Sequence, residues 1–359
     1  MNIFIIILLC FSLLGFIDKM FHLQLHLSDS FDKGILTMGS MALSIVGICS
    51  VGVTFIQNHV QTISRIFAFL PFDTSLIIGA LLAPDMGGFS ITQQLAQNKE
   101  VLIFNGVILS SILGQTISFQ FPVFLSAIDK KEYPTLMKGF IIGIIIVPIG
   151  LIITAIALKM TLSLFLSLCL PIFSICLIIT TCLFKAPQKT IQVFTSVAKI
   201  IQWLTYFMFF IAVLGIFFPQ YAYADQTLVY DSVITAFKIA IIVSGSLVLS
   251  ELIFRKIKPQ IHYLANLLHI NDISMIGLIL SCATSLAILP LYDQMDVKGK
   301  LLNAAFSVSG AYVIGGQLGF ISNVCDGHIV TLYMIIKLIC GIISLFVMSW
   351  IYEKAITLK

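Results

Sequence analysis

The chain has 359 residues, of which 59% are hydrophobic and only 10% are charged, with a formal net charge of +4. Soluble domains carry about 25% charged residues, so this composition excludes a soluble globular protein and indicates a polytopic membrane protein. The net charge then reports membrane topology and gives no support for nucleic-acid binding. Runs such as IIGIIIVPIGLIITAIAL at 141–158 favour spanning helices over the alternating pattern of spanning strands.

Nine apolar segments have about the length that a membrane-crossing helix needs, roughly 17 to 25 residues. The first has no basic leader and no small-residue cleavage site, so we interpret it as a span rather than a signal peptide. Two further apolar segments, 75–83 and 275–290, are short or interrupted: PDMGG follows the first, and small polar residues lie within the second. The predicted spans are 2–17, 34–55, 101–122, 136–158, 161–184, 199–218, 233–254, 301–322 and 329–351.

The distribution of lysine and arginine predicts how these segments cross the membrane, because cytoplasmic loops are enriched in basic residues. If both short segments are re-entrant, 15 of the 20 basic residues lie on one side, three lie on the other, and two lie within spans. Full crossings by the short segments would weaken this asymmetry. We therefore expect re-entrant or broken segments within 66–98 and 261–300, an external N-terminus and a cytoplasmic C-terminus.

The two halves of the chain correspond at a separation near 200 residues. At a separation of 198, Asn105 aligns with Asn303 and Gly79 aligns with Gly277. Because the extra span 161–184 lies between the copies, the second copy enters the membrane inverted, as in many secondary transporters. The predicted fold is all-α, with a first repeat at 1–158, a linking span at 159–190 and an inverted second repeat at 191–359.

Four short motifs resemble the family of ethanolamine utilisation membrane proteins, EutH. They are FDKGILTMGSM at 31–41, DMGGF at 85–89, QMDVKGKLLN at 294–303 and LGF at 318–320. The resemblance runs from Asp18 to beyond Lys337. It implies a bacterial inner-membrane permease that brings ethanolamine into the cytoplasm, where a cobalamin-dependent pathway consumes it.

The sequence departs from the pattern that this resemblance implies at two places. Gly316 and Gln317 replace an expected acidic residue and histidine, and Thr284 and Ser285 replace an expected pair of asparagines. These changes leave the substrate class in place and leave the exact substrate open. The hydroxyls of Thr284 and Ser285 stay candidate contacts for a substrate or a coupled sodium ion.

Asp85 is the strongest candidate for contact with the substrate. Ethanolamine at neutral pH is a small ammonium ion with one hydroxyl, and an acid within the membrane is costly unless it has a function. Gly87 and Gly88 would let the backbone turn beside that carboxylate and approach a ligand. The alternative is that Asp85 only caps a helix, and both roles can coexist.

Four amide side chains are further candidates. Asn105 and Asn303 correspond across the repeat and would reach toward a central site, or they hydrogen-bond neighbouring helices instead. Gln115 and Gln317 lie beside glycines. Gln115 lies further along the same predicted span as Asn105, and Gln317 further along the same span as Asn303. We expect Gln115 and Gln317 to supply additional polar contacts.

Two charged residues could have roles outside the substrate site. Asp296 could contact the substrate, or it could pair with Lys298 or Lys300 at the cytoplasmic surface. Lys337 lies within an apolar span, where it needs a partner, and a buried salt bridge is the leading explanation.

These observations predict a transporter for a small amino alcohol rather than an enzyme. The chain has no HExxH, GxSxG or GxGD motif, and its cysteines and histidines lack metal-ligand spacing. We expect no cofactor and no metal, and a homodimer is one expected assembly. A facilitator, a proton- or sodium-coupled carrier, and a carrier of another small amine remain open alternatives.

Overall fold

The computed structural model describes residues 3–67, 69, 71–256 and 258–357, and these residues form helices and no strands. The first half contains α1 (Ile3–Phe21), α2 (Ser28–Leu36), α3 (Met38–Val46), η1 (Gly47–Gly52), α4 (Val53–Phe67), α5 (Ser75–Leu81), η2 (Pro84–Met86), α6 (Gly88–Leu95), α7 (Lys99–Leu102), η3 (Ile103–Gly114), η4 (Thr116–Gln120), α8 (Phe121–Ala127), η5 (Lys130–Glu132), α9 (Tyr133–Ile145) and α10 (Val147–Ala157). Segments η1, η3 and η4 are π-helical, and η2 and η5 are 3₁₀ turns.

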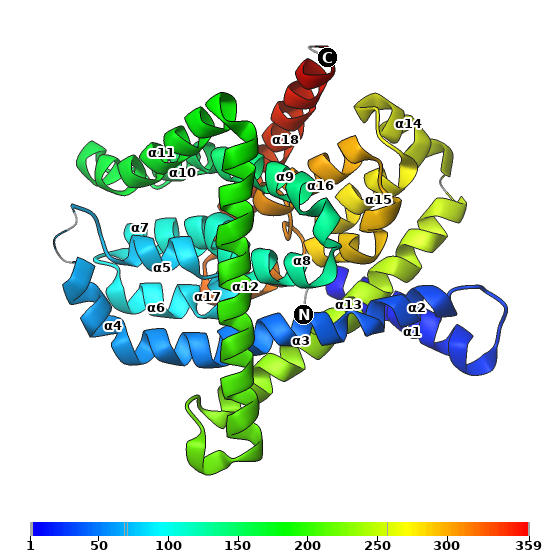
Figure 1. Ribbon diagram of the computed structural model, residues 1–359, viewed down its shortest axis with the longest axis horizontal. Coiled ribbons are helices and arrows are strands. Elements are labelled where there is room, and N and C mark those ends of the chain that lie inside the picture. The colour runs from blue at the N-terminus through cyan, green and yellow to red at the C-terminus, as the bar shows by residue number, and fades with distance from the viewer. Residues whose placement is uncertain (1–2, 68, 70, 257, 358–359) are drawn as a thin grey trace.

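After the linking helix α11 (Leu162–Lys185), the second half begins with α12. It contains α12 (Pro187–Phe217), η6 (Pro219–Tyr221), α13 (Gln226–Lys256), α14 (Lys258–Leu268), α15 (Asp272–Ser281), η7 (Ser285–Gln294), α16 (Val297–Ser309), α17 (Gly316–Val324) and α18 (Gly327–Thr357). In the view of Figure 1, α5, α6 and α7 lie on one side of α12, and α14, α15 and α16 lie on the other.

Seven segments of the described residues are long and apolar enough to cross a membrane, which makes this a multi-pass membrane protein. A further pair, Pro259–Leu268 and Asp272–Ser281, is bent by 92° at its break. Large apolar side chains on α11 and α12, such as Ile178 and Trp203, are exposed, as expected of helices that face lipid. The seven segments are Ala42–Phe67, Lys99–Ala127, Lys130–Ala157, Leu162–Lys185, Pro187–Phe217, Gln226–Leu252 and Gly327–Lys354.

Two of the predicted spans are not continuous helices. The span predicted at 34–55 is interrupted at Thr37 and its helix continues to Phe67, because α4 is amphipathic and its polar residues conceal its true end. The span predicted at 301–322 is not continuous: α16 ends at Ser309 and α17 starts at Gly316. Residues 310–315 can leave the helical conformation because Tyr312 and Ile314 hydrogen-bond to the backbone at the end of α15, as described below.

Each of the two short apolar segments is followed or interrupted by a break in its helix. Helix α5 ends at Leu81, residues 82–83 are extended, and the 3₁₀ turn η2 follows. Helix α15 ends at Ser281, Thr284 is extended, and the 3₁₀ segment η7 follows. Each break exposes backbone groups that cannot stay unpaired inside a membrane.

Different partners satisfy the backbone at the two breaks. In the first, the Ser110 hydroxyl donates to the carbonyl of Leu82, and the Ala83 N–H donates to the Ser118 hydroxyl at 3.0 Å. In the second, the N–H of Tyr312 donates to Ser281 O at 3.1 Å, and the N–H of Ile314 donates to Cys282 O at 3.0 Å. The second break therefore pairs with the break between α16 and α17.

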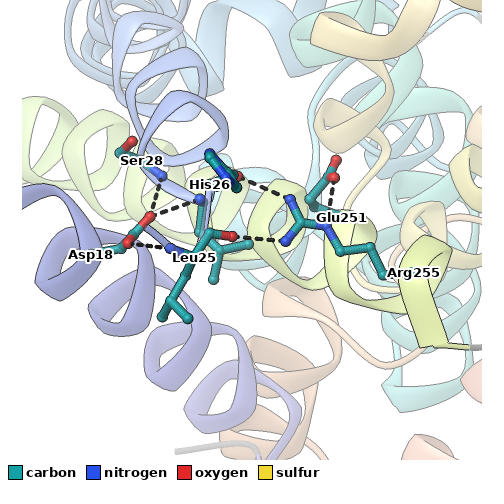
Figure 2. Close-up of polar contacts among 7 residues, drawn as sticks. Asp18, Leu25, His26, Ser28, Glu251 and Arg255 are labelled. Carbon is teal, nitrogen blue, oxygen red and sulfur yellow. Dashed lines mark hydrogen bonds and ion pairs between the residues drawn. The ribbon is translucent and has the colours of Figure 1, made fainter. Parts of the chain in front are cut away.

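The hairpin between α1 and α2 is fastened by a cluster of charged side chains (Figure 2). The Asp18 carboxylate accepts hydrogen bonds from the backbone N–H groups of Leu25, Leu27 and Ser28 at 2.8–3.1 Å. The donation from Leu27, with the other two, lowers the pKa of Asp18 below its ordinary value of 3.8.

On the other side of this loop, Arg255 of α13 donates to the carbonyls of Leu25 and His26 and pairs with Glu251 at 3.0 Å. The hairpin is thereby attached to α13, which also packs against α1 and α2.

Ion pairs connect the ends of several helices. Lys300 pairs with Glu132 at 3.0 Å, with side chains only 10% and 18% exposed, and Lys298 pairs with Glu353 at 2.9 Å. Lys99 pairs with Asp326 at 3.0 Å, with both side chains 74% exposed. The predicted pairing of Asp296 with Lys298 or Lys300 is therefore wrong, because both lysines have other acidic partners.

Candidate functional site

A cavity of about 440 Å³ lies where the two broken segments converge. Its wall includes residues 83–87 except Pro84 at the first break, 283–286 except Ser285 at the second, and 312–317 except Val313 between α16 and α17. Helices α4 and α13 supply the remaining long sides, from Gln57 on α4 and from Leu228 to Ile242 on α13. The non-helical backbone at the breaks thus forms part of the cavity wall, and membrane proteins tolerate such backbone only where it is covered by protein or lines a cavity.

Asp85 projects into this cavity from the 3₁₀ turn η2. Gly87 ends that turn with φ of 88°, a left-handed conformation that a residue with a side chain adopts only at a cost. The carboxylate lies inside the protein and is accessible from the cavity, which it faces. The side chain of Gln317 lies near it on the same wall. Asp85 accepts no helix-capping hydrogen bond from α6, whose N-cap position is Gly87.

Gln115, which lies between the π-helical segments η3 and η4, lines the same cavity. Its side chain is only 2% exposed, and neither its Oε1 nor its Nε2 has a hydrogen-bond partner among the described residues. Buried amides in proteins are rarely left unpaired, because the lost hydrogen bonds cost about 1–3 kcal/mol. An unpaired buried amide on a cavity wall is therefore suited to a polar ligand.

At the second break, Thr284 lines the cavity and caps η7 by accepting from Leu286 N at 3.3 Å. Ser285 does not reach the cavity wall. It lies behind it, 2.9 Å from the hydroxyl of Tyr312 and 3.2 Å from Nε2 of Gln120. Tyr312 has φ of 66°, a strained conformation that places it on the wall.

Asn105 and Asn303 lie beside the broken helices rather than on the cavity wall. Asn105 Nδ2 donates to the Ser75 hydroxyl at 2.8 Å, and Asn303 Nδ2 donates to the carbonyls of Ser274 and Gly299 at 2.9 and 3.0 Å. These bonds match the alternative of helix-to-helix hydrogen bonding.

Asp296 and Gly88 also have places away from the wall. Asp296 caps α16 by accepting from Gly299 N at 3.2 Å, and it accepts from Asn271 N at 2.9 Å. Gly88 donates its N–H to Ala83 O at 3.0 Å, and a side chain there would overlap that carbonyl. Gly88 therefore supports the turn that holds Asp85.

The sequence analysis did not single out three polar residues of α13 that line the cavity. Asp231, Thr235 and Lys238 recur every three or four residues and so share one face of the helix. No hydrogen bond or ion pair joins the side chains of Asp231 or Lys238 to other described residues. Their seven-residue spacing within an apolar span was the signal that could have identified them.

The buried salt bridge predicted for Lys337 is wrong. Its Nζ donates to the backbone carbonyl of Ser111 at 3.0 Å, and no acidic side chain in the described part of the chain pairs with it. This carbonyl belongs to the π-helical segment η3, which the apolar pattern of the sequence does not distinguish from an α-helix.

Comparison with known proteins provides an independent line of evidence. The family described as "Ethanolamine utilisation protein, EutH" matches residues 1–351. A "Probable ethanolamine permease EutH" of Listeria monocytogenes is 29% identical over 95% of this chain and 91% of its own. A protein of the same name from Salmonella typhimurium is 27% identical over 90% and 85%, and "Uncharacterized protein YxeR" of Bacillus subtilis is 27% identical over 89% and 86%. No solved structure matches the chain.

Proposed function

The chain belongs to the ethanolamine utilisation protein EutH family, and from that premise we propose that it carries ethanolamine, as the ammonium ion, across the bacterial cytoplasmic membrane. The observation that carries the proposal is that Asp85 and Gln115, whose buried amide has no hydrogen-bond partner among the described residues, line one cavity. The carboxylate would neutralise the ammonium, and the amide would hydrogen-bond the hydroxyl. Gln317 and Thr284, on the same wall, would complete the polar contacts.

The geometry of the two broken segments supports an inverted repeat. Asn98 caps α7 by accepting from Val101 N at 2.9 Å, and Asp296, 198 residues later, caps α16 in the same way. A Cβ on Gly79 would overlap the backbone of Asn105, and one on Gly277 would overlap the side chain of Asn303.

The helix packing is reciprocal in the same sense. Helix α1, which opens the first half, packs on α13 of the second half. Helix α12, which opens the second half, packs on α3 and η1 of the first half. We therefore retain 1–158 and 191–359 as the two repeats, with 159–190 as the link.

The ion pairs support the proposed orientation, with a cytoplasmic C-terminus. Lys300, Glu132, Lys298 and Glu353 all belong to loops or ends that the charge distribution assigns to the cytoplasm, and they pair with each other. Lys99 and Asp326 are both assigned to the outside, and they also pair. In Figure 1 the α1–α2 hairpin lies at the right, α14 at the upper right and the end of α18 at the top, away from the turn between α12 and α13 at the bottom.

The cavity opens toward the outside in this orientation. Its lining on α13 starts at Leu228, within the first turn, and stops at Ile242, well before the end of the helix. On α4 it extends to Gln57, toward the end that carries Arg65. An outward-open cavity is the conformation in which a transporter accepts an external substrate.

Uptake of labelled ethanolamine into proteoliposomes, with and without an imposed proton or sodium gradient, tests this function. Saturable uptake that stops at equal concentrations would identify a facilitator. Accumulation beyond equilibrium under one gradient would identify a carrier coupled to that ion. Absence of uptake of ethanolamine, together with uptake of another small amine, would refute the substrate assignment.

A further inference from the structure

A buried lysine lies behind the cavity and is not part of its wall. Lys337 is 0% exposed in the middle of α18, and its Nζ donates to the backbone carbonyl of Ser111 at 3.0 Å. A lysine inside a membrane protein is costly and usually has a function. Its partner lies in the π-helical segment η3, four residues before Gln115.

The carbonyl that Lys337 contacts is the one that Gln115 leaves unused. In an α-helix, the N–H of Gln115 would donate to the carbonyl four residues earlier, which is that of Ser111. Here it donates instead to the carbonyls of Ile112 and Ser110. Since the extra residue of a π-turn changes the direction of the side chains that follow it, the contact with Lys337 favours the backbone path that points Gln115 into the cavity.

A second residue of α18, one turn before Lys337, contacts the other cavity glutamine. The hydroxyl of Tyr333 lies 2.9 Å from Oε1 of Gln317 and 2.9 Å from the carbonyl of Tyr312. When Oε1 of Gln317 accepts from Tyr333, its Nε2 is left to donate to Asp85. Tyr333 is fully buried and does not line the cavity.

We propose that Lys337 and Tyr333 are positioning residues of the substrate site, with Lys337 orienting Gln115 for the substrate hydroxyl and Tyr333 orienting Gln317 toward Asp85. Lys337 acts by occupying the Ser111 carbonyl. Without it, Gln115 regains an α-helical hydrogen bond to Ser111 and its side chain turns from the cavity. This proposal rests on the proposed function for its substrate and on the observed geometry for its mechanism.

The first experiment compares the uptake of ethanolamine with that of ethylamine, which lacks the hydroxyl. One uncharged hydrogen bond contributes about 0.5–1.5 kcal/mol, or roughly 2- to 12-fold in Vmax/KM. The wild-type protein should therefore prefer ethanolamine over ethylamine by that factor. We expect Lys337→Met to remove this preference while ethylamine uptake stays within about threefold of wild type. Lys138→Met, which removes a lysine elsewhere in the bundle, should retain the preference. Equal losses for both amines would overturn the assignment to Lys337, because a general folding defect lowers both.

Tyr333→Phe should raise the KM for both amines by roughly 2- to 12-fold, because Gln317 loses its orientation toward the carboxylate that binds the ammonium. An unchanged KM in a protein that inserts normally would overturn the role of Tyr333.

The second experiment needs no transport and so separates this proposal from the proposed function. In Gln115→Cys, a small membrane-impermeant cationic thiol reagent should modify the new thiol through the cavity, as quantified by peptide mass spectrometry. Adding Lys337→Met should slow this modification by about tenfold, whereas adding Lys138→Met should not. An unchanged rate with Lys337→Met would show that Lys337 does not orient position 115, whatever the substrate is.

Discussion

Replacing Asp85 by asparagine removes the charge of the proposed ammonium contact and keeps the side-chain shape. A cavity of about 440 Å³ is far larger than ethanolamine, so water shares it with the substrate. An effective dielectric constant near 20 is then appropriate, at which a carboxylate and an ammonium about 4 Å apart interact by about 4 kcal/mol. Allowing for the hydration that the free carboxylate regains, we expect a net loss of about 2–4 kcal/mol, or roughly 30- to 1,000-fold in affinity.

The small size of ethanolamine makes this loss easy to detect. The best small ligands gain about 1.5 kcal/mol per non-hydrogen atom, which limits ethanolamine to roughly 6 kcal/mol and a Kd of tens of micromolar at best. A loss of about 3 kcal/mol therefore moves the Kd to several millimolar. In a proteoliposome assay, Asp85→Asn should show no saturable uptake at micromolar ethanolamine.

Asp231→Asn is the matched control, because it removes a carboxylate from the same cavity nearer its opening. Its side chain is exposed, so its attraction for the ammonium is screened and contributes at most about 1 kcal/mol, less at high salt. We expect a KM increase of no more than about fivefold, which added salt reduces. Normal KM and Vmax in a correctly inserted Asp85→Asn would refute the assignment of the ammonium site.

Three further predictions concern other parts of the structure. Gly315→Ala should destabilise the protein by about 1–3 kcal/mol in a thermal-unfolding assay, because a Cβ would overlap the carbonyl of Ala283 at the second break. Gly316→Ala, beside open space, should change stability by less than about 0.5 kcal/mol. Asp18 has a lowered pKa, so its stabilisation of the α1–α2 loop persists above pH 3.8 and is lost as the pH falls through that lowered pKa. Amide hydrogen exchange in the loop of the wild-type protein should therefore accelerate only at such low pH, whereas Asp18→Asn should accelerate it already at neutral pH. Glu132→Gln removes the acidic partner of the buried Lys300, so it should favour opening at the face that we propose is cytoplasmic. Modification of a Ser90→Cys thiol from inside-out vesicles should then be faster, and an unchanged rate would contradict this.

Continuous apolar runs predicted most of the membrane helices. The span predicted at 161–184 is α11, Leu162–Lys185, because an uninterrupted apolar segment has few alternatives in a bilayer. The interruption at 310–315 could not be predicted, because the sequence there is as apolar as its surroundings. It is stable only through hydrogen bonds to residues 281–282, about 30 positions away.

The residues of the candidate site could also be predicted only in part. Asp85, Gln115, Thr284 and Gln317 could be selected because polar residues in apolar surroundings are conspicuous, and all four line the cavity. Asn105 and Asn303 were equally conspicuous, and their bonds run to the neighbouring broken helices. Which polar side chain meets the cavity depends on helix rotation, and the π-helical turns alter that rotation without a recognisable sequence signal.

The pairing of the two breaks in the second half has a consequence for how the protein is made. The free carbonyls of Ser281 and Cys282 receive their hydrogen bonds from Tyr312 and Ile314, which the ribosome adds about 30 residues later. Until then these carbonyls would lie unpaired in lipid, at a cost of several kcal/mol each. The α15–η7 segment therefore cannot settle at its final depth by itself. It must wait at the aqueous surface or inside the insertion machinery and enter the bilayer together with α16 and α17, as one unit.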